Sequence, residues 1–315
     1  MNNTIFVNIG LPDEGAHQIL NSFTLPVMEF GRTSGLLTPL EENLHINMKT
    51  VKYSPYEKVV ELIASIVAGC EHTVTINSRR VPDTALAMEV IYKDRFADQS
   101  GANRLLNALT DENVAELERA FSAYYPLHGS AGRAVKGELM VDLDATGFVA
   151  NGRKYEGASK GHLGNCRGSH GGSGYRASFA HSNGEMTACV FDSCGATESH
   201  HLDALLKMVR LRIGSPKVRG IVIRGGAAYG TATIVDKLID LGFLFLLKGN
   251  QPSSARKSAR RIRSWTMVGD YSYGELRARV NGSRHRVRVV VTGGPASAFT
   301  SSPPYPTYST RRTGC

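Results

Sequence analysis

The sequence predicts a mixed α/β fold, with a sheet flanked by helices and an all-helical module before it. Between residues 50 and 128, four segments carry helical apolar spacing or helix-capping residues. After residue 138 the pattern changes to three strands in succession and then to strands that alternate with helices. A hairpin-led group followed by alternating helices and strands indicates a sheet with antiparallel and parallel pairs.

The clearest helical signal begins at Ser54, which can cap a helix whose first residue is Pro55. Apolar residues then recur at helical spacing as far as Val67, and Gly69 is a suitable end. We expect further helices over residues 84–92, 99–109 and 111–124.

Residues 126–132 contain one proline and two glycines and predict a break after the helices. The mixed composition of residues 1–50 predicts turns and only short apolar segments. The helix over 99–109 is compatible with a helix-turn-helix that recognises DNA. A dimerisation or packing unit is an equal alternative from the sequence alone.

The strand region begins at residue 138. Its apolar residues Leu139, Val141 and Leu143 alternate with Met140, Asp142 and Asp144. Asn183-Gly184 between two strand-like runs predicts a hairpin. The glycine-rich stretch that precedes this hairpin, 152–174, has the composition of a mobile loop. The elements expected after the hairpin are a helix over 198–213, a strand over 218–223, a helix over 231–241 and a strand over 243–247.

The formal net charge is +9, from 37 basic and 28 acidic side chains in 315 residues, but it is unevenly placed. Residues 201–315 hold 20 basic and five acidic side chains. This asymmetry indicates a polyanionic partner for the C-terminal part, most simply nucleic acid. An arginine-rich solvated surface is the alternative.

Cysteine usage and hydropathy exclude several classes of protein. Five cysteines without a CxxC pair do not form a disulfide framework, and they indicate a reduced, cytoplasmic protein. The longest apolar stretch, 241–247, is far below the roughly 20 residues of a membrane span. The glycine-rich loop lacks the spacing of a phosphate-binding P-loop, so no nucleotide cofactor is expected. A zinc site is disfavoured, since its candidate ligands are loosely spaced: Cys166, His170, Cys189, Cys194, His200 and His201.

The segment VDLDATG carries the sharpest chemical feature. Asp142 and Asp144 lie on one face of the expected strand, because side chains alternate with a period of two. Carboxylates on a strand are suitable ligands for Mg²⁺, and a two-metal centre supports phosphodiester chemistry. The alternative, which is simpler for such a short pattern, is that these carboxylates only accept hydrogen bonds from turn amides at the end of a strand.

Taken in order, these motifs resemble the RNase H-like catalytic core of DDE transposases of bacterial insertion sequences. VDLDATG resembles the first catalytic strand, GIVIRGGAAYG the fourth strand and its turn, and LIDLGFLFLLKGNQ the next helix and strand. The resemblance implies metal-dependent DNA cleavage and strand transfer with Mg²⁺ or Mn²⁺, Asp144 as the catalytic metal ligand, and transposon-end DNA as the partner. A homodimer is a further expectation.

The sequence departs from the family pattern at two catalytic positions. The family's second metal-binding Asp corresponds to Gly226, between matching Arg224 and Tyr229. The helix that carries the third carboxylate, a Glu in a Tyr-x2-Arg-x3-Glu pattern, has no counterpart. We therefore expect a catalytically impaired, truncated transposase, or alternatively a non-catalytic DNA-binding remnant that competes for transposon ends.

The basic segment after residue 250 is the second candidate site, and its composition predicts strands. Six of its side chains are expected to contact DNA phosphates and bases: Arg256, Lys257, Arg260, Arg261, Arg263 and Trp265. The expected organisation is a helical DNA-binding or dimerisation module (1–130), an RNase H-like core (131–250), an incomplete basic β-rich insertion (251–292) and a disordered tail (293–315).

Overall fold

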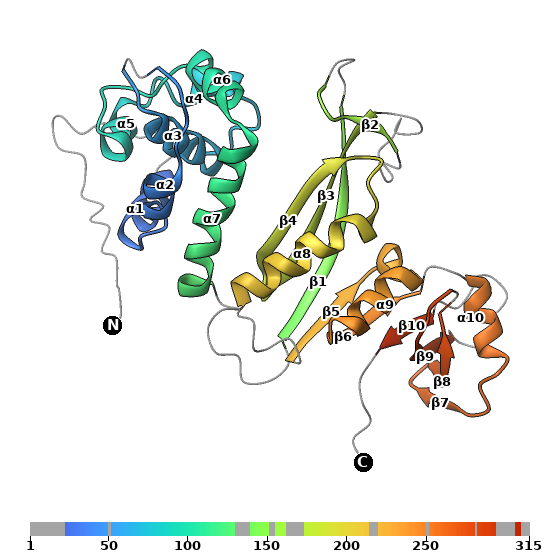
Figure 1. Ribbon diagram of the computed structural model, residues 1–315. Coiled ribbons are helices and arrows are strands. Elements are labelled where there is room, and N and C mark those ends of the chain that lie inside the picture. Colours follow the sequence, from blue (N-terminus) through green and yellow to red (C-terminus); the bar gives the residue numbers. More distant parts are fainter. Residues whose placement is uncertain are drawn as a thin grey trace. The chain divides into compact units, whose positions relative to one another are not determined.

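The computed structural model (Figure 1) describes residues 23–49, 52–129, 139–150, 155–161, 173–213, 220–249, 252–280, 282–293 and 306–309. The chain divides into two compact units, Met1–Tyr124 and Tyr125–Cys315. The first is helical, and the second contains the sheet and its helices.

The N-terminal unit is built from helices, as the sequence predicts, and the predicted boundaries hold closely for three of them. Ser54 and Glu57 form a capping box: the Glu57 amide donates to Ser54 Oγ at 3.1 Å, and the Ser54 amide donates to Glu57 Oε2 at 2.7 Å. The helices are α1 (Thr24–Thr33), α2 (Thr38–Asn43), α3 (Pro55–Val67), α4 (Val74–Arg79), α5 (Thr84–Ile91), α6 (Gln99–Ala108) and α7 (Asp111–His128).

Two expectations for this region are wrong. Helices α1 and α2 lie in a part where only turns and short apolar pieces were expected. Helix α7 continues through Pro126 to His128, although proline there was expected to end it. Proline removes one backbone donor, but only the last turn of the helix follows it.

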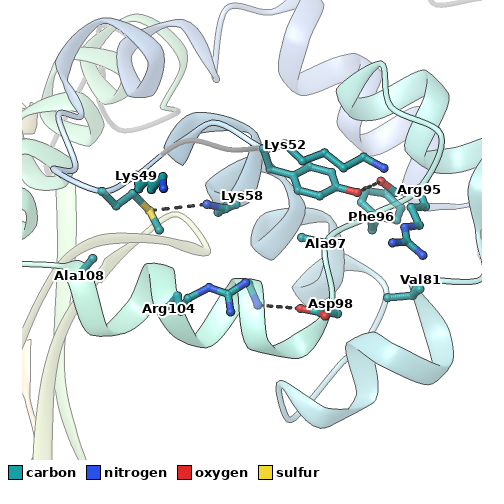
Figure 2. A pocket seen from close by; sticks show the side chains of 13 residues that line it. Lys49, Lys52, Lys58, Val81, Arg95, Phe96, Ala97, Asp98, Arg104 and Ala108 are labelled. Carbon is teal, nitrogen blue, oxygen red and sulfur yellow. Dashed lines mark hydrogen bonds between the residues drawn. The ribbon is translucent and has the colours of Figure 1, made fainter.

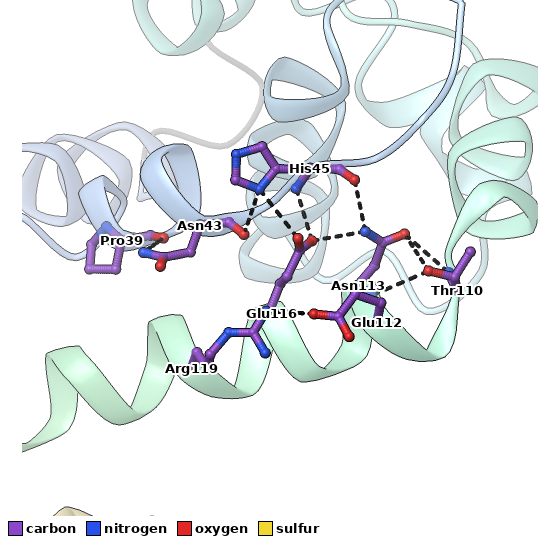
Figure 3. A network of polar contacts seen from close by, with 8 residues as sticks. All are labelled: Pro39, Asn43, His45, Thr110, Glu112, Asn113, Glu116 and Arg119. Carbon is purple, nitrogen blue, oxygen red and sulfur yellow. Dashed lines mark hydrogen bonds and ion pairs between the residues drawn. The ribbon is translucent and has the colours of Figure 1, made fainter.

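A polar network joins the segment after α2 to helix α7 (Figure 3). The Glu116 carboxylate is buried and accepts hydrogen bonds from the His45 amide at 2.9 Å and from Asn113 Nδ2 at 2.8 Å. The Asn113 side chain also donates to the His45 carbonyl at 3.0 Å. These bonds favour the ionised carboxylate, so they lower the pKa of Glu116, the His45 amide contributing most.

The C-terminal unit contains one continuous sheet among its described residues, with strand order β2-β3-β1-β5-β6-β10-β9-β8-β7 and with β4 paired to β3. Strand β1 pairs antiparallel with β3 and parallel with β5, and β5 pairs parallel with β6. The strands are β1 (Leu139–Val149), β2 (Ser159–Lys160), β3 (Ser173–Ser182), β4 (Glu185–Ser193), β5 (Ile221–Gly225), β6 (Leu244–Lys248), β7 (Trp265–Val268), β8 (Tyr271–Arg279), β9 (Arg286–Gly293) and β10 (Pro306–Ser309).

The order β4-β3-β1-β5-β6, three antiparallel strands followed by two parallel ones, is the RNase H-like arrangement, so the predicted fold class is confirmed. The hairpin turn is also confirmed, since Asn183 (φ 53°) and Gly184 (φ 79°) both have the positive φ of a type I′ turn. Helices α8 (Glu198–Ile213) and α9 (Ala232–Asp240) have the expected positions.

The core lies between α8, α9 and one face of the sheet (Figure 1). Val141 and Leu143 of β1 and Ile223 of β5 project into it and are almost fully buried. The helices meet them with Leu202, Leu205, Val209, Ile234, Val235 and Leu238.

The structure corrects two expectations in the C-terminal part. The basic segment begins with a helix, α10 (Pro252–Ala259), rather than a strand. Proline suits the first helical position, and Ala, Arg and Lys are good helix formers. Within the tail expected to be disordered, residues 306–309 form β10, which pairs antiparallel with β6 and β9 and so joins the two parts of the sheet.

The glycine-rich loop, predicted to be mobile, lies largely outside the described residues, as does the remainder of the tail.

We predict that Glu116→Gln lowers the midpoint of thermal unfolding at pH 7 and that the difference narrows at acid pH. The pKa of Glu116 is lowered in the folded state, so its stabilisation is complete above the unfolded value of about 4.3 and is lost as pH falls through the folded pKa. Calorimetry at pH 7 and pH 3 checks this. Glu71→Gln, at an exposed position, is the control, and an equal midpoint for Glu116→Gln and Glu71→Gln at pH 7 would contradict the prediction.

Candidate functional site

Asp144 lies on β1, on the face of the sheet opposite the core, and its side chain is exposed. Its Oδ1 accepts a hydrogen bond from the Ala145 amide at 2.9 Å. Leu143 of β1 pairs with Gly225 of β5 in parallel register, so Asp144 and Gly226 are the next positions along two neighbouring chain segments. The register therefore makes Asp144 and Gly226 neighbouring positions.

Packing does not require glycine at position 226. A Cβ added to Gly226 has no heavy atom within 4 Å, and the backbone (φ −68°, ψ −173°) is open to any residue. Its neighbour Gly225 is different, because a Cβ there would lie 2.9 Å from Tyr229 Cβ. Position 226 thus has room for a carboxylate that the chain does not supply.

Asp142 shares the face of Asp144, but its carboxylate is engaged in an ion pair. Arg224, its register partner on β5, donates from Nε to Oδ1 at 2.5 Å and from Nη2 to Oδ2 at 2.7 Å. This hydrogen-bonded contact holds the pKa of Arg224 above its usual range. Both Asp142 oxygens are used, so Asp142 does not replace the missing ligand.

Tyr229 connects the turn after β5 to strand β1. Its hydroxyl donates to the Asp144 backbone carbonyl at 3.0 Å, and the side chain is only 2% exposed. Burial raises the pKa of Tyr229 to about 12, which keeps the phenol protonated as a donor. The family-like Tyr229 therefore acts on the position of Asp144 through the backbone.

A chain of polar side chains that no sequence motif indicates lies beneath helix α8. Ser178 Oγ lies 2.7 Å from His201 Nδ1, and His201 Nε2 lies 3.5 Å from Asp192 Oδ2. Ser178 and His201 are 0% and 1% exposed, so a substrate does not reach the hydroxyl. The arrangement fixes α8 on β3 and offers no nucleophile. Its members are far apart in sequence, and only the strand register could have revealed it.

The described residues do not fit a two-metal centre. Asp144 contributes one carboxylate, Gly226 none, and Asp142 is bound to Arg224. Nowhere in the described part of the chain do three His, Cys, Asp or Glu side chains gather as metal ligands. Of the zinc candidates, Cys166 and His170 lie outside the described residues.

The six candidate DNA-contacting side chains lie on α10, on the turn after it and at the start of β7. All six are exposed, and no ion-pair partner is found for the five basic ones within the described ranges. Trp265 pairs with Gly274 of β8, and a Cβ at Gly274 would lie 3.2 Å from the indole Cδ2. The indole is thus placed against bare backbone while 37% of the residue stays exposed.

In the described residues, every helix is too short or too polar to cross a membrane.

Comparison with protein-family models and with curated proteins finds no match. Among solved structures, the chain is similar to a piggyBac transposase synaptic complex with hairpin DNA, with a TM-score of 0.43 and 10% identity over 92% of this chain and 61% of that one. A Mos1 transposase paired-end complex with the left transposon end gives a TM-score of 0.24 and 12% identity over 63% of this chain and 60% of that one. A pre-cleavage Mos1 transpososome gives a TM-score of 0.24 and 11% identity over 75% of this chain and 78% of that one. The chain spans about three fifths of the piggyBac chain that it matches.

We predict that Tyr229→Phe lowers the free energy of unfolding by about 1–2 kcal/mol, since the Asp144 carbonyl loses a buried donor. Urea denaturation of the full chain measures the change. Tyr271→Phe removes a hydroxyl from a residue that is 63% exposed and serves as the control. Equal stability of the two variants would show that the Tyr229 bond contributes nothing.

Proposed function

We propose that this chain derives from a DDE transposase of bacterial insertion sequences and binds DNA without cutting or joining it. The observation that carries this proposal is the pair of neighbouring positions Asp144 and Gly226 on an RNase H-like sheet. The strand register supports the proposal, because Asp144 and Gly226 follow the paired residues Leu143 and Gly225 and only one of the two positions carries a carboxylate. Mg²⁺ or Mn²⁺ would thus have a single protein ligand here, too few to organise a two-metal reaction.

DNA binding is supported by the basic segment of α10 and β7. Its five basic side chains project into solvent, and none is neutralised by a carboxylate in the described residues. Such a cluster attracts phosphates without sequence preference, and a half-exposed Trp265 can stack on an unpaired base. Occupation of transposon ends in competition with an active transposase belongs to the same proposal, and it needs base contacts in addition to these phosphate contacts.

Plasmid nicking and strand-transfer assays with Mg²⁺ or Mn²⁺ test the absence of chemistry. We expect no product above background from the purified chain and the same result for Asp144→Ala. Robust product that disappears in Asp144→Ala would refute the proposed inactivity.

We predict that neutralising Arg256, Arg260 and Arg263 to Gln weakens binding to duplex DNA and makes it less dependent on salt. Each lost phosphate contact reduces the slope of log K against log salt by about 0.9. Fluorescence anisotropy between 50 and 200 mM salt, about the range over which such contacts lose affinity, measures the slope. Arg119→Gln, an exposed arginine already paired with Glu112 in the helical unit, is the matched control. An unchanged slope in the triple variant would place DNA binding elsewhere.

We also predict that Gly226→Asp creates a divalent-metal site without restoring DNA cleavage. The side chain fits, and it adds a second carboxylate beside Asp144. Manganese binding, followed by electron paramagnetic resonance, should tighten by roughly tenfold or more, since even outer-shell partners change metal affinity 10- to 100-fold. Asp144→Asn in the same background should abolish the gain. If the double variant kept the tighter manganese binding, the two positions would not share a metal.

A further inference from the structure

A cavity of about 700 Å³ lies within the helical unit, between α3, α6 and the segments that lead into them (Figure 2). Five of its lining residues are basic, namely Lys49, Lys52, Lys58, Arg95 and Arg104, while Asp98 is its one acidic residue in the described part of the chain. Its size falls within the range of about 300–1,000 Å³ typical of small-molecule sites.

Lys58, which lines the cavity, is a buried cation that forms no ion pair with an acid in the described residues. The residue is 8% exposed, and the contact of its ammonium is with Met48 Sδ at 3.8 Å (Figure 2). Among the described residues no carboxylate pairs with it. Arg80, a fully buried cation of the same unit, lies 3.7 Å from the Asp83 carboxylate by contrast.

Two acids flank Lys58 on its helix. Glu57 is engaged elsewhere, by Lys93 at 3.2 Å and by the Ser54 amide, although its charge still acts on Lys58. Glu61 carries little charge at neutral pH. Burial raises the pKa of Glu61 to about 8, so its carboxyl group is mostly neutral at pH 7. Glu61 Oε2 accepts the Ala97 amide at 3.1 Å, which gives the group a structural role. Burial and the nearby Arg104 together lower the pKa of Lys58, as expected for an ammonium without a counterion.

The other acids around the cavity are also engaged. Asp98 caps helix α6, accepting the Gly101 amide at 2.9 Å and the Ser100 hydroxyl at 2.6 Å. Asp94 pairs with Lys52 at 2.8 Å. The remaining basic groups, on Lys49, Lys58, Arg95 and Arg104, are left without an ion-pair partner in the described residues. The cavity therefore has an excess of positive charge that an anion from outside can neutralise.

The largest apolar side chains of the lining are Tyr53, Val81 and Phe96. Tyr53 is half-buried, whereas Phe96 is only 1% exposed and lies behind the surface of the cavity. The Tyr53 hydroxyl donates to the Arg95 carbonyl at 2.9 Å, which fixes the ring at the edge of the cavity. A single inorganic anion would leave the Tyr53 ring and most of the volume unused. A ligand with both a planar ring and a phosphate uses both parts.

We propose that this cavity binds a nucleotide, with its phosphate on Lys58 and Arg104 and its base against the half-buried ring of Tyr53. The nucleotide is either free or the terminal unit of a DNA strand, since both carry the same phosphate and base. The site uses no glycine-rich P-loop, the motif on which the sequence-based exclusion of a nucleotide cofactor relied. It is also separate from the proposed DNA contacts of α10 and β7, so either proposal can fail alone.

Isothermal titration of the full chain tests the proposal, with ATP, adenosine and a short duplex that bears a 5′-phosphate as probes. We expect saturable ATP binding, with adenosine at least roughly thirtyfold weaker because it lacks the charged partner. Lys58→Met should weaken ATP binding by a similar factor, while Lys207→Met, an exposed lysine of α8, should leave it unchanged. Circular dichroism verifies that Lys58→Met is folded, and Arg104→Gln, at an exposed position, gives a second variant that does not depend on burial.

Competition then distinguishes the two sources. Displacement of ATP by the phosphorylated duplex in a chain with Arg256, Arg260 and Arg263 neutralised indicates a DNA terminus as the ligand, and no displacement indicates a free nucleotide. Absence of saturable binding by ATP and duplex alike in that variant, or equal ATP affinity in the wild type, Lys58→Met and Arg104→Gln, would overturn the proposal.

Discussion

The pairing of β1 on both of its edges is the constraint on which the C-terminal unit depends. One edge of the strand pairs antiparallel with β3, and the other pairs parallel with β5. Val141 and Leu143 are 0% and 3% exposed, and a slip of one residue would turn them to solvent and bury Asp142 and Asp144. The hydrophobic core therefore fixes the register, and the register fixes which side chains meet on the opposite face.

The residues that stabilise the fold are therefore separate from those on the open face of the sheet. The residues that bury apolar area face α8 and α9, whereas Asp142, Asp144 and Gly226 lie at or beside the open face. Two carboxylates held side by side without a metal repel each other, so glycine at 226 relieves a local cost and disturbs no packing. The Asp142–Arg224 pair neutralises a further charge at the same surface. Stability and metal chemistry thus depend on different sets of residues.

The sequence predicted the elements whose signals are local. The Ser54 cap before Pro55, the Asn183-Gly184 turn and the alternation of β1 each depend on neighbours within a few residues. Helices α1 and α2 were missed, since α1 has no side-chain cap and α2 is only six residues long. Strand β10 was missed because its stability comes from β6 and β9, which are distant in sequence.

The candidate sites also divide into those with a local sequence signal and those without one. Asp144, Gly226 and the basic run from Arg256 were found because each belongs to a contiguous motif. The engagement of Asp142 by Arg224 depends on the strand register, and the cavity around Lys58 collects residues from positions 48 to 108. No spacing rule connects such residues, because helices α3 and α6 meet only through packing.

The two groups of cations in this chain therefore have different physical consequences. The side chains of α10 and β7 are solvated, so their charge costs little, and salt screens it over a distance of about 8 Å at physiological ionic strength. Lys58 is buried, and a buried cation without a partner opposes folding. An anion that enters the cavity removes this opposition, so ligand binding and the stability of the helical unit are linked through the same ammonium group. The exposed group can attract a polyanion from a distance, whereas the buried one discriminates by fit.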